Sequence, residues 1–249
     1  MKRVCILLMT ILLSSLPAMS VAKEPDWSAY EKLLSNYVKP GVKNGVNLNS
    51  VDYHEIKASP LLRKAVAKIE AFKPSELSSK EERLAFYINA YNIYAIKMVV
   101  DHLPLKSIKD VGSFFSSVWK KDIGRIDGQV ISLDEIEHDI LRPMGEPRIH
   151  MAIVCASVSC PDLRQEPYTA KNLSHQLDDQ SKSFLRNAKK GLNVNGNELY
   201  ISKIFDWFED DFDAVGGVKQ FVLSHRQSLH PNVKIKSYLP YDWNLNSTK

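Results

Sequence analysis

Apolar residues recur at helical spacing in the first third of the chain. In 27–38 and again in 61–72 they stand three and four positions apart. This spacing places apolar side chains on one face of a helix, so each stretch predicts an amphipathic helix. The apolar positions are Trp27, Tyr30, Leu33, Leu34 and Tyr37 in the first stretch and Leu62, Ala65, Val66 and Ile69 in the second.

The strongest predicted helix follows these two. Ser78 and Ser79 stand three residues before Glu81 and Glu82, which is the pattern of a capping box. No glycine or proline interrupts 84–100. Proline cannot continue a helix, so Pro104 is expected to end it.

Two hairpins are predicted by glycine-containing turns between short apolar segments. Asp127-Gly128 separates DIGRI from QVISL, and Gly196 lies in the middle of 193–201. Turns of this composition match the twist of antiparallel strands.

The remaining elements are mostly helical. Ser132 and Glu135 form a capping box for a short helix that Pro143 should stop. Further helices are expected at about 170–187 and 218–225, and an extended segment at 233–239. This order of helices and hairpins indicates an α+β fold, with a helical N-terminal part packed on a small antiparallel sheet in a single domain. The predicted division is a signal peptide at 1–22, a helical segment at 23–78 and the α+β domain at 79–249.

The N-terminus has the pattern of a secretory signal. Lys2 and Arg3 precede the apolar run 4–16, and Ser20-Val21-Ala22 is a small-x-small cleavage site. The apolar run is short and no second hydrophobic segment follows it, so we expect export to the periplasm or full secretion and no integral membrane segment after cleavage. Cys5 should be removed with the signal.

Charge does not indicate a nucleic-acid partner. The chain has 33 basic and 29 acidic residues, and loss of Lys2 and Arg3 leaves a net charge of about +2. No cluster of Lys and Arg interleaved with aromatic residues is present, which a phosphate backbone would require. We therefore expect a small-molecule or peptide ligand.

Candidate chemistry gathers in RIHMAIVCASVSCPDL, residues 148–163. A thiolate beside an imidazole that has taken its proton can attack a carbonyl carbon. His150 falls in a predicted strand, 149–154, and Cys160 in the turn after it. Cys155 is an odd number of residues from His150, and a regular strand would place the two on opposite faces. Cys160 is therefore the preferred nucleophile, with Ser159 beside it as a substrate contact.

A disulfide between Cys155 and Cys160 is the alternative. An exported chain with two remaining cysteines is the ordinary setting for a bridge, and closing this short loop would stabilise the fold by roughly 2 kcal/mol. His150 would then be a core histidine in a binding module without catalytic activity. Redox catalysis is disfavoured, because the spacing is Cys-x4-Cys and no thioredoxin-like pattern surrounds it.

Two asparagines in the strongest helix are the next candidates. Asn89 and Asn92, in FYINAYNIYAIK, are three residues apart and share a face. Their amides either hold neighbouring loops or line a binding cleft. The imidazole of His150 also needs an orienting group, and Glu137, Asn89 and Asn92 are the candidates for that role. His138 and Arg142, on the same short helix as Glu137, are further candidate substrate contacts.

The stretch ISKIFDWFEDDF, residues 201–212, mixes aromatic and acidic side chains. Phe205, Phe208 and Phe212 predict the core face of a short helix, with the carboxylates on its solvated face. The alternative places Asp210 or Asp211 in the cleft with Lys203. Trp119, Trp207 and Trp243 are expected to be packing residues.

No cofactor or metal is expected. The chain has no HExxH or paired CxxC motif, no phosphate-binding loop and no G-x-G-x-x-G, and Ser157 and Ser159 lack the G-x-S-x-G turn of serine hydrolases.

Four ordered motifs, FYINAYNIYAIK, ISLDEIEHDILR, RIHMAIVCASVSCPDL and ISKIFDWFEDDF, together resemble the domain of unknown function 547 family over about 81–221. The resemblance implies a domain and no particular reaction. It directs attention to the residues that stand where the family has the same types: Asn89, Asn92, Glu137, His138, Arg142, His150, Cys155, Cys160 and Pro161.

The leading hypothesis from these observations is an exported thiol-dependent hydrolase or acyltransferase acting on an amide or ester. Its predicted catalytic residues are Cys160, His150, Glu137 and Asn89, and its predicted substrate contacts are Asn92, His138, Arg142 and Ser159. The alternative is the disulfide-stabilised binding module.

Overall fold

The computed structural model describes residues 24–112 and 117–248. The predicted signal peptide and Cys5 lie outside the described residues. The fold is α+β, as predicted, with helices in the majority and small sheets of two or three strands.

The N-terminal part packs its helices around one central helix. Helix α4 (Lys80–Asp101) is buried on most of its faces, because α2, α3, β3 and later loops surround it. Its predicted capping box is confirmed: the Ser79 hydroxyl accepts from the Glu82 N–H, and a Glu82 carboxylate oxygen accepts from the Ser79 N–H, both at 3.1 Å. The other helices here are α1 (Ser28–Tyr37), α2 (Tyr53–Ala58) and α3 (Leu61–Ala71).

Both predicted hairpins are confirmed, and a third was not predicted. The pair β3 (Asp122–Ile126) and β4 (Gln129–Ser132) and the pair β5 (Leu192–Asn195) and β6 (Glu198–Ile201) are antiparallel. The additional hairpin joins β1 (Val38–Lys43) and β2 (Val46–Val51). Asn44 and Gly45 at its turn both have positive φ, as a two-residue hairpin turn requires, so an Asn-Gly signal was present in the sequence.

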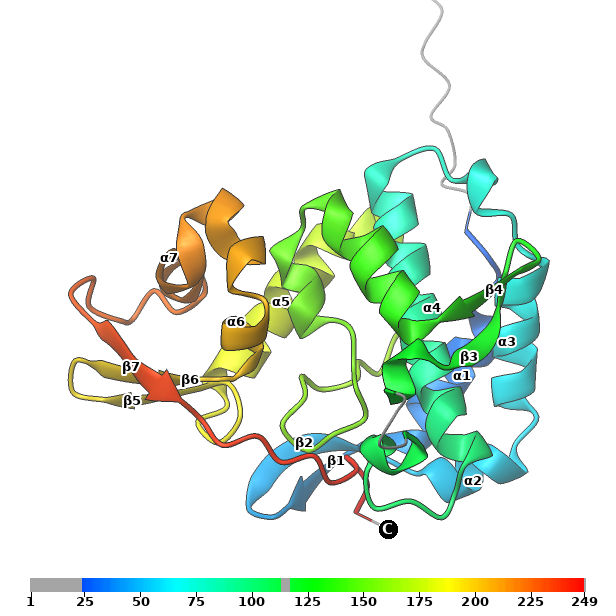
Figure 1. Cartoon of the computed structure of the whole chain (residues 1–249), viewed down its shortest axis with the longest axis horizontal. Helices are drawn as coiled ribbons and strands as arrows, with labels where there is room; N and C mark the ends of the chain where they lie inside the picture. The colour runs from blue at the N-terminus through cyan, green and yellow to red at the C-terminus, as the bar shows by residue number, and fades with distance from the viewer. Residues whose placement is uncertain (1–23, 113–116, 249) are drawn as a thin grey trace, which may run out of the picture.

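The C-terminal part contains α5 (Leu173–Arg186), α6 (Ile204–Trp207), α7 (Gly217–His225) and β7 (Lys234–Tyr238). Strand β7, the predicted extended segment, pairs with β6 in parallel. In Figure 1, β5, β6, β7 and α7 lie on one side of the view and α1, α3 and α4 on the other. Short helices complete the chain: η1 (Pro74–Glu76), η2 (Ile108–Val111), η3 (Val118–Lys120), η4 (Glu135–Leu141), η5 (Arg142–Met144), η6 (Pro147–Met151), η7 (Ala170–Asn172) and η8 (Glu209–Val215).

The predicted strand at 149–154 is wrong. Residues 147–151 form the 3-10 helix η6, and an irregular segment follows it. Pro147 supplies a fixed φ at the first helical position, and the Glu146 side chain accepts from the Arg148 N–H at 3.1 Å. Beyond the helix, the Val154 N–H bonds to the side chain of Asn92 and not to a neighbouring strand. The apolar run is therefore buried without being extended.

Two apolar cores make up most of the buried interior, and a small third cluster joins Val46, Leu48 and Val158. The larger is built from α1 to α4 and the segment around Cys160, and the smaller from α5 to α7 with β5 and β6. The chain after β7 returns to the N-terminal hairpin, where the Val51 N–H donates to the Asn246 carbonyl at 2.9 Å (Figure 1). None of the described helices has the length and apolar character needed to cross a bilayer.

Candidate functional site

The two cysteines lie together between the cores. Cys155 is partly exposed and Cys160 is buried, and both are free thiols. The cysteines approach to 2.6 Å and are not bonded. The Cys155 backbone N–H also donates to the Cys160 sulfur at 2.8 Å. The predicted disulfide is therefore not formed in this structure.

The loop between the cysteines is held by the C-terminal segment. The Val158 N–H donates to the Asn244 carbonyl, and the Asn246 N–H donates to the Ala156 carbonyl. Ala156 itself has a φ of 60°, a left-handed conformation that costs a non-glycine residue energy. The fold thus maintains a tight turn that brings Cys160 back onto Cys155.

Hydroxyl groups surround the Cys155 sulfur. The Ser157 hydroxyl lies 3.1 Å and the Tyr241 hydroxyl 3.2 Å from this sulfur. Burial opposes ionisation of Cys155, but hydrogen bonds from Cys160, Ser157 and Tyr241 outweigh it and lower its pKa to about 7. Burial keeps the pKa of Tyr241 well above its usual value, so its hydroxyl remains a donor.

Cys160 has the opposite properties. Its side chain is 3% exposed. Burial and the neighbouring Cys155 together raise the Cys160 pKa well above the ordinary value for a thiol. The geometry therefore favours Cys155 over the predicted Cys160 as the nucleophile.

Glu137 is an acidic group whose pKa responds to the charge of Cys155. It lies on η4, a π-helix, a rare geometry that occurs frequently at functional sites. The Tyr91 hydroxyl donates to a Glu137 carboxylate oxygen at 3.2 Å. Burial, with a contribution from the charge of Cys155, raises the Glu137 pKa to about 7. The carboxyl group therefore gains and loses a proton near neutral pH.

His150 is oriented by Asp211, which was considered for the cleft only as an alternative. Its Nε2 lies 2.7 Å from an Asp211 carboxylate oxygen, and Arg142 makes two hydrogen bonds to the same carboxylate. The prediction of a solvated face for all these carboxylates is thus wrong for Asp211, because η8 turns it toward Arg142. The Phe208 ring stacks on the imidazole with centroids 4.1 Å apart. Burial lowers the His150 pKa despite the Asp211 carboxylate.

Asn89 and Asn92 hold loops. The Asn92 amide accepts from the Val154 N–H at 2.8 Å and donates to the Ala152 carbonyl at 3.0 Å. Asn89 bonds in the same way to the backbone N–H and carbonyl of Tyr168. Both amides are therefore used by backbone groups, which is the loop-holding alternative of the two considered. Neither orients His150.

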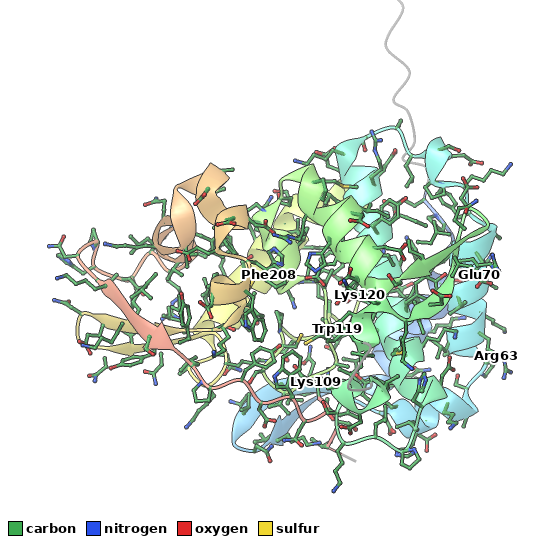
Figure 2. The ribbon with its side chains drawn as sticks, in the orientation of Figure 1. Arg63, Glu70, Lys109, Trp119, Lys120 and Phe208 are labelled. Atoms are coloured by element: carbon green, nitrogen blue, oxygen red, sulfur yellow. The ribbon has the colours of Figure 1, made fainter. Side chains whose placement is uncertain are left out.

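A cavity of about 140 Å³ opens beside the cysteines. Cys155, His150 and Glu137 line it, and so does His138, whose side chain is 39% exposed. Aromatic side chains form much of the remaining wall: Trp119, Trp207, Phe208, Tyr241 and Trp243. Figure 2 shows Phe208 and Trp119 near the middle of the view, whereas Arg63 and Glu70 of α3 lie on the outer side.

The tryptophans come from separate elements. Trp207 on α6 stacks with Trp243 at 5.6 Å between centroids, and Tyr241 lies 4.5 Å from Trp243. These residues contact one another and form part of the wall of the cavity, where Trp207 is 42% exposed. No sequence periodicity links these residues, and only tertiary folding brings them together.

The other predicted substrate contacts have structural partners. Arg142 pairs with Asp211 and also donates to His138 Nδ1 at 2.8 Å. The Ser159 hydroxyl accepts from the Asp242 N–H at 2.8 Å and is buried. Neither residue is among those that line the cavity of Cys155. Of the four predicted contacts, only His138 lines that cavity.

Sequence reasoning missed Ser157, Tyr241 and Tyr91 as partners of the site. Ser157 stands two residues from Cys155, so its proximity was visible in the sequence, but it was considered only as a serine-hydrolase nucleophile. Tyr241 lies far along the chain and carried no signal. Within 24–112 and 117–248, no three His, Cys, Asp or Glu side chains converge as a metal site requires.

Comparison with known proteins identifies the central part of the chain. No curated protein and no solved structure matches it. Residues 74–185 match the model of the family described as "Protein of unknown function, DUF547". The matched segment contains both asparagines, Glu137, His150 and both cysteines, and ends before the ISKIFDWFEDDF motif. The predicted resemblance is confirmed: over 74–185, which holds Cys155 and the π-helix, this chain is similar to the DUF547 family.

Proposed function

We propose that the protein is a thiol-dependent hydrolase or acyltransferase in which Cys155 is the nucleophile and Glu137 its proton partner. The observation that carries this proposal is the environment of Cys155. Cys155 lines the cavity, its sulfur lies within hydrogen-bond distance of two hydroxyl groups, and its pKa is about 7. A substantial fraction of this cysteine is therefore thiolate at neutral pH.

Cys155 takes the role that the sequence suggested for Cys160. That suggestion assumed a strand at 149–154, in which His150 and Cys155 would lie on opposite faces. The segment begins as a 3-10 helix, so this argument does not apply. A buried thiol with a raised pKa is a poor nucleophile. Cys160 instead donates a hydrogen bond that helps to stabilise the Cys155 thiolate.

We prefer Glu137 to His150 as the proton partner because the pKa of Glu137 depends on the charge of Cys155. The charge of Cys155 contributes to the raised pKa of Glu137, whereas the groups that act on His150 are Asp211, Arg142 and His138. A carboxyl group with a pKa near 7 is suited to both accepting and donating a proton at neutral pH. His150, covered by Phe208 and paired with Asp211, serves as a wall of the cavity and holds η6 against η8.

The proposed reaction has two steps. The Cys155 thiolate attacks the carbonyl carbon of an ester or amide, and protonated Glu137 gives its proton to the departing alkoxide or amine. A thioester on Cys155 results. Ionised Glu137 then takes a proton from water or from an acceptor nucleophile, which attacks the thioester and releases the Cys155 thiolate. The Tyr241 and Ser157 hydroxyls stabilise the thiolate before and after the cycle.

The compartment is proposed from the N-terminal pattern. A charged start, an apolar run and a small-x-small site support export to the periplasm or beyond. An aromatic cavity of about 140 Å³ suits a small ligand or a single side chain of a peptide.

The test is acylation by p-nitrophenyl acetate, using the full chain with Cys5→Ser so that Cys155 and Cys160 are the only cysteines. We expect a stoichiometric burst of p-nitrophenol followed by turnover, with acetyl on Cys155 by peptide mass spectrometry. Cys155→Ser should abolish both phases. The matched variant Cys160→Ser should still acetylate at Cys155, more slowly because a hydroxyl replaces a thiol donor.

The proposal fails if Cys155→Ser retains the burst, or if acetyl is found on Cys160. It also fails if the acetyl group on Cys155 is never hydrolysed or transferred to an added amine or alcohol. In that case Cys155 is a reactive thiol without the second step.

The close approach of the two cysteines favours a second candidate, a binding module closed by a Cys155–Cys160 disulfide. In this case the aromatic cavity binds a ligand and no covalent step occurs. Protein recovered from its native compartment and alkylated without reductant distinguishes the two. Complete resistance of both cysteines until reduction, with no ester turnover after reduction, supports the binding module, and labelling of Cys155 supports the enzyme.

A further inference from the structure

The two cysteines differ in access as well as in acidity. Both cysteines line the cavity, but Cys155 is partly exposed, whereas Cys160 is only 3% exposed. Cys155 is therefore the more accessible of the two cysteines. The Cys160 sulfur lies against Cys155, and the Cys155 N–H donates to it at 2.8 Å.

The loop between them is held so that the sulfurs stay together. Backbone hydrogen bonds to the C-terminal segment, accepted by the 156 carbonyl and donated by the 158 and 159 N–H groups, hold the turn, and Ala156 keeps its left-handed φ within it. Asn92 fastens the entry to the loop at Val154. Bond formation between the two sulfurs thus requires only a small approach from 2.6 Å and no rearrangement of the fold.

We propose that this pair catalyses thiol–disulfide exchange with a low-molecular-weight disulfide, Cys155 attacking and Cys160 resolving. The proposal depends on the nucleophilic Cys155 of the proposed function and adds a second activity to the same cavity. The small size of the cavity selects a small disulfide over a folded protein substrate. An attacking thiol whose pKa lies near the ambient pH, as for Cys155, is the most effective kind.

The exchange consists of two successive displacements at sulfur. The Cys155 thiolate attacks one sulfur of the ligand RS–SR, a Cys155–SR bond forms, and RS⁻ leaves with the electron pair of the broken bond. That RS⁻ takes the proton of the Cys160 thiol. The Cys160 thiolate then attacks the Cys155 sulfur, the Cys155–Cys160 bond forms, and the second RS⁻ leaves and is protonated by solvent. The ligand disulfide gains two electrons and the cysteine pair loses two.

Exchange also has a consequence for acyl transfer. In the oxidised form Cys155 has no thiolate, so ester turnover stops until a dithiol reductant restores the pair. The fold tolerates both forms because the loop already holds the sulfurs in contact.

The experiment uses the full Cys5→Ser chain, reduced with dithiothreitol, freed of reductant and exposed to oxidised glutathione. Samples are quenched with acid and their masses measured. The parent should lose two hydrogens and carry little glutathione at any time. Cys160→Ser should accumulate one glutathione adduct on Cys155, at least about tenfold more than the parent, because an intramolecular resolving thiol has a high effective concentration. Cys155→Ser should react much more slowly than either.

The outcomes separate this inference from the proposed function. If the parent accumulates as stable an adduct on Cys155 as Cys160→Ser does, Cys160 does not resolve it and the inference is overturned, while acylation of Cys155 is unaffected. If neither glutathione nor p-nitrophenyl acetate modifies Cys155, both proposals fail. Reaction of Cys160 with oxidised glutathione in Cys155→Ser as fast as the reaction of the parent would also overturn the inference.

Discussion

At the scale of single residues, the proposed function depends on an electrostatic coupling between the ionisations of Cys155 and Glu137. Hydrogen bonds outweigh burial and lower the pKa of Cys155 to about 7. Burial raises the pKa of Glu137 to about 7. Each charge disfavours the other, so removing one should make the other ionise more readily. This coupling is measurable without knowledge of the natural substrate.

Glu137→Gln should separate thiol reactivity from acyl transfer. The amide is neutral, so we expect the pH midpoint of Cys155 alkylation by iodoacetamide to fall by roughly half a unit to one unit. Turnover of p-nitrophenyl acetate should fall about 100-fold, because the proton partner is lost. Alkylation rates measured from pH 5 to 9 and ester kinetics on the same protein test the prediction.

Cys155→Ser in the same alkylation assay is the control that assigns the midpoint to Cys155. An unchanged midpoint in Glu137→Gln would show that the two groups are not coupled. Unchanged ester turnover would show that Glu137 is not the proton partner and would return that role to His150.

At the scale of elements, helix α4 places the cysteine loop through a single amide. Asn92 satisfies the backbone on both sides of Ile153, immediately before Cys155, whereas Asn89 makes the equivalent bonds to Tyr168 on another segment. The two asparagines are thus a matched pair in chemistry and burial that differ in what they hold.

Asn92→Leu and Asn89→Leu should therefore have equal effects on stability and different effects on the thiol. Each leaves a buried N–H and carbonyl without a partner, so we expect each to lower the free energy of unfolding by roughly 2–4 kcal/mol. Only Asn92→Leu should slow alkylation of Cys155 at pH 7, because only it releases the loop. Urea denaturation and iodoacetamide kinetics measure the two effects. Equal loss of thiol reactivity in both variants would contradict this assignment.

The turn between the cysteines should carry measurable strain. Ala156 has a φ of 60°, which glycine adopts without cost, so Ala156→Gly should raise the free energy of unfolding by roughly 0.5 kcal/mol. Ala152, with a φ of −111°, is the matched control, and Ala152→Gly should lower it by about 1 kcal/mol. Chemical denaturation of both variants checks the difference. Destabilisation by Ala156→Gly as large as that by Ala152→Gly would show that the turn is not strained.

At the scale of the whole molecule, the site occupies the boundary between two apolar cores. Cys155 packs against the larger core and Tyr241 and Phe208 against the smaller. Burial at this boundary raises the pKa of Glu137 and so links the site to stability.

The pH dependence of stability follows from that link. The folded pKa of Glu137, about 7, lies above the ordinary 4.5, so folding favours the protonated form. Its contribution to stability is complete below pH 4.5 and is lost as the pH rises through 7. Glu137→Gln, which stays neutral, should gain roughly 1–3 kcal/mol relative to the parent between pH 5 and pH 8. Urea denaturation at both pH values tests this, and an equal difference at both would contradict it.

Local patterns in the sequence determined most of the helices, two of the hairpins and the segment that carries the chemistry. Capping at Ser79 and the turn at Asp127-Gly128 depend on neighbouring residues alone, so they were predictable. The strand predicted at 149–154 was wrong because an apolar run shows burial and not conformation.

Only the tertiary structure decided which residues act together. The choice between Cys155 and Cys160 depends on access and hydrogen bonding, and Tyr241 reaches the Cys155 sulfur from 86 positions further along the chain. Asp211 reaches His150 across 61 positions in the same way. Contacts at such separations, and the burial that shifts the pKa of Glu137, arise from the packing of the two cores. The sequence therefore determined which chemical groups are available, and long-range packing determined their partners, their exposure and their acidity.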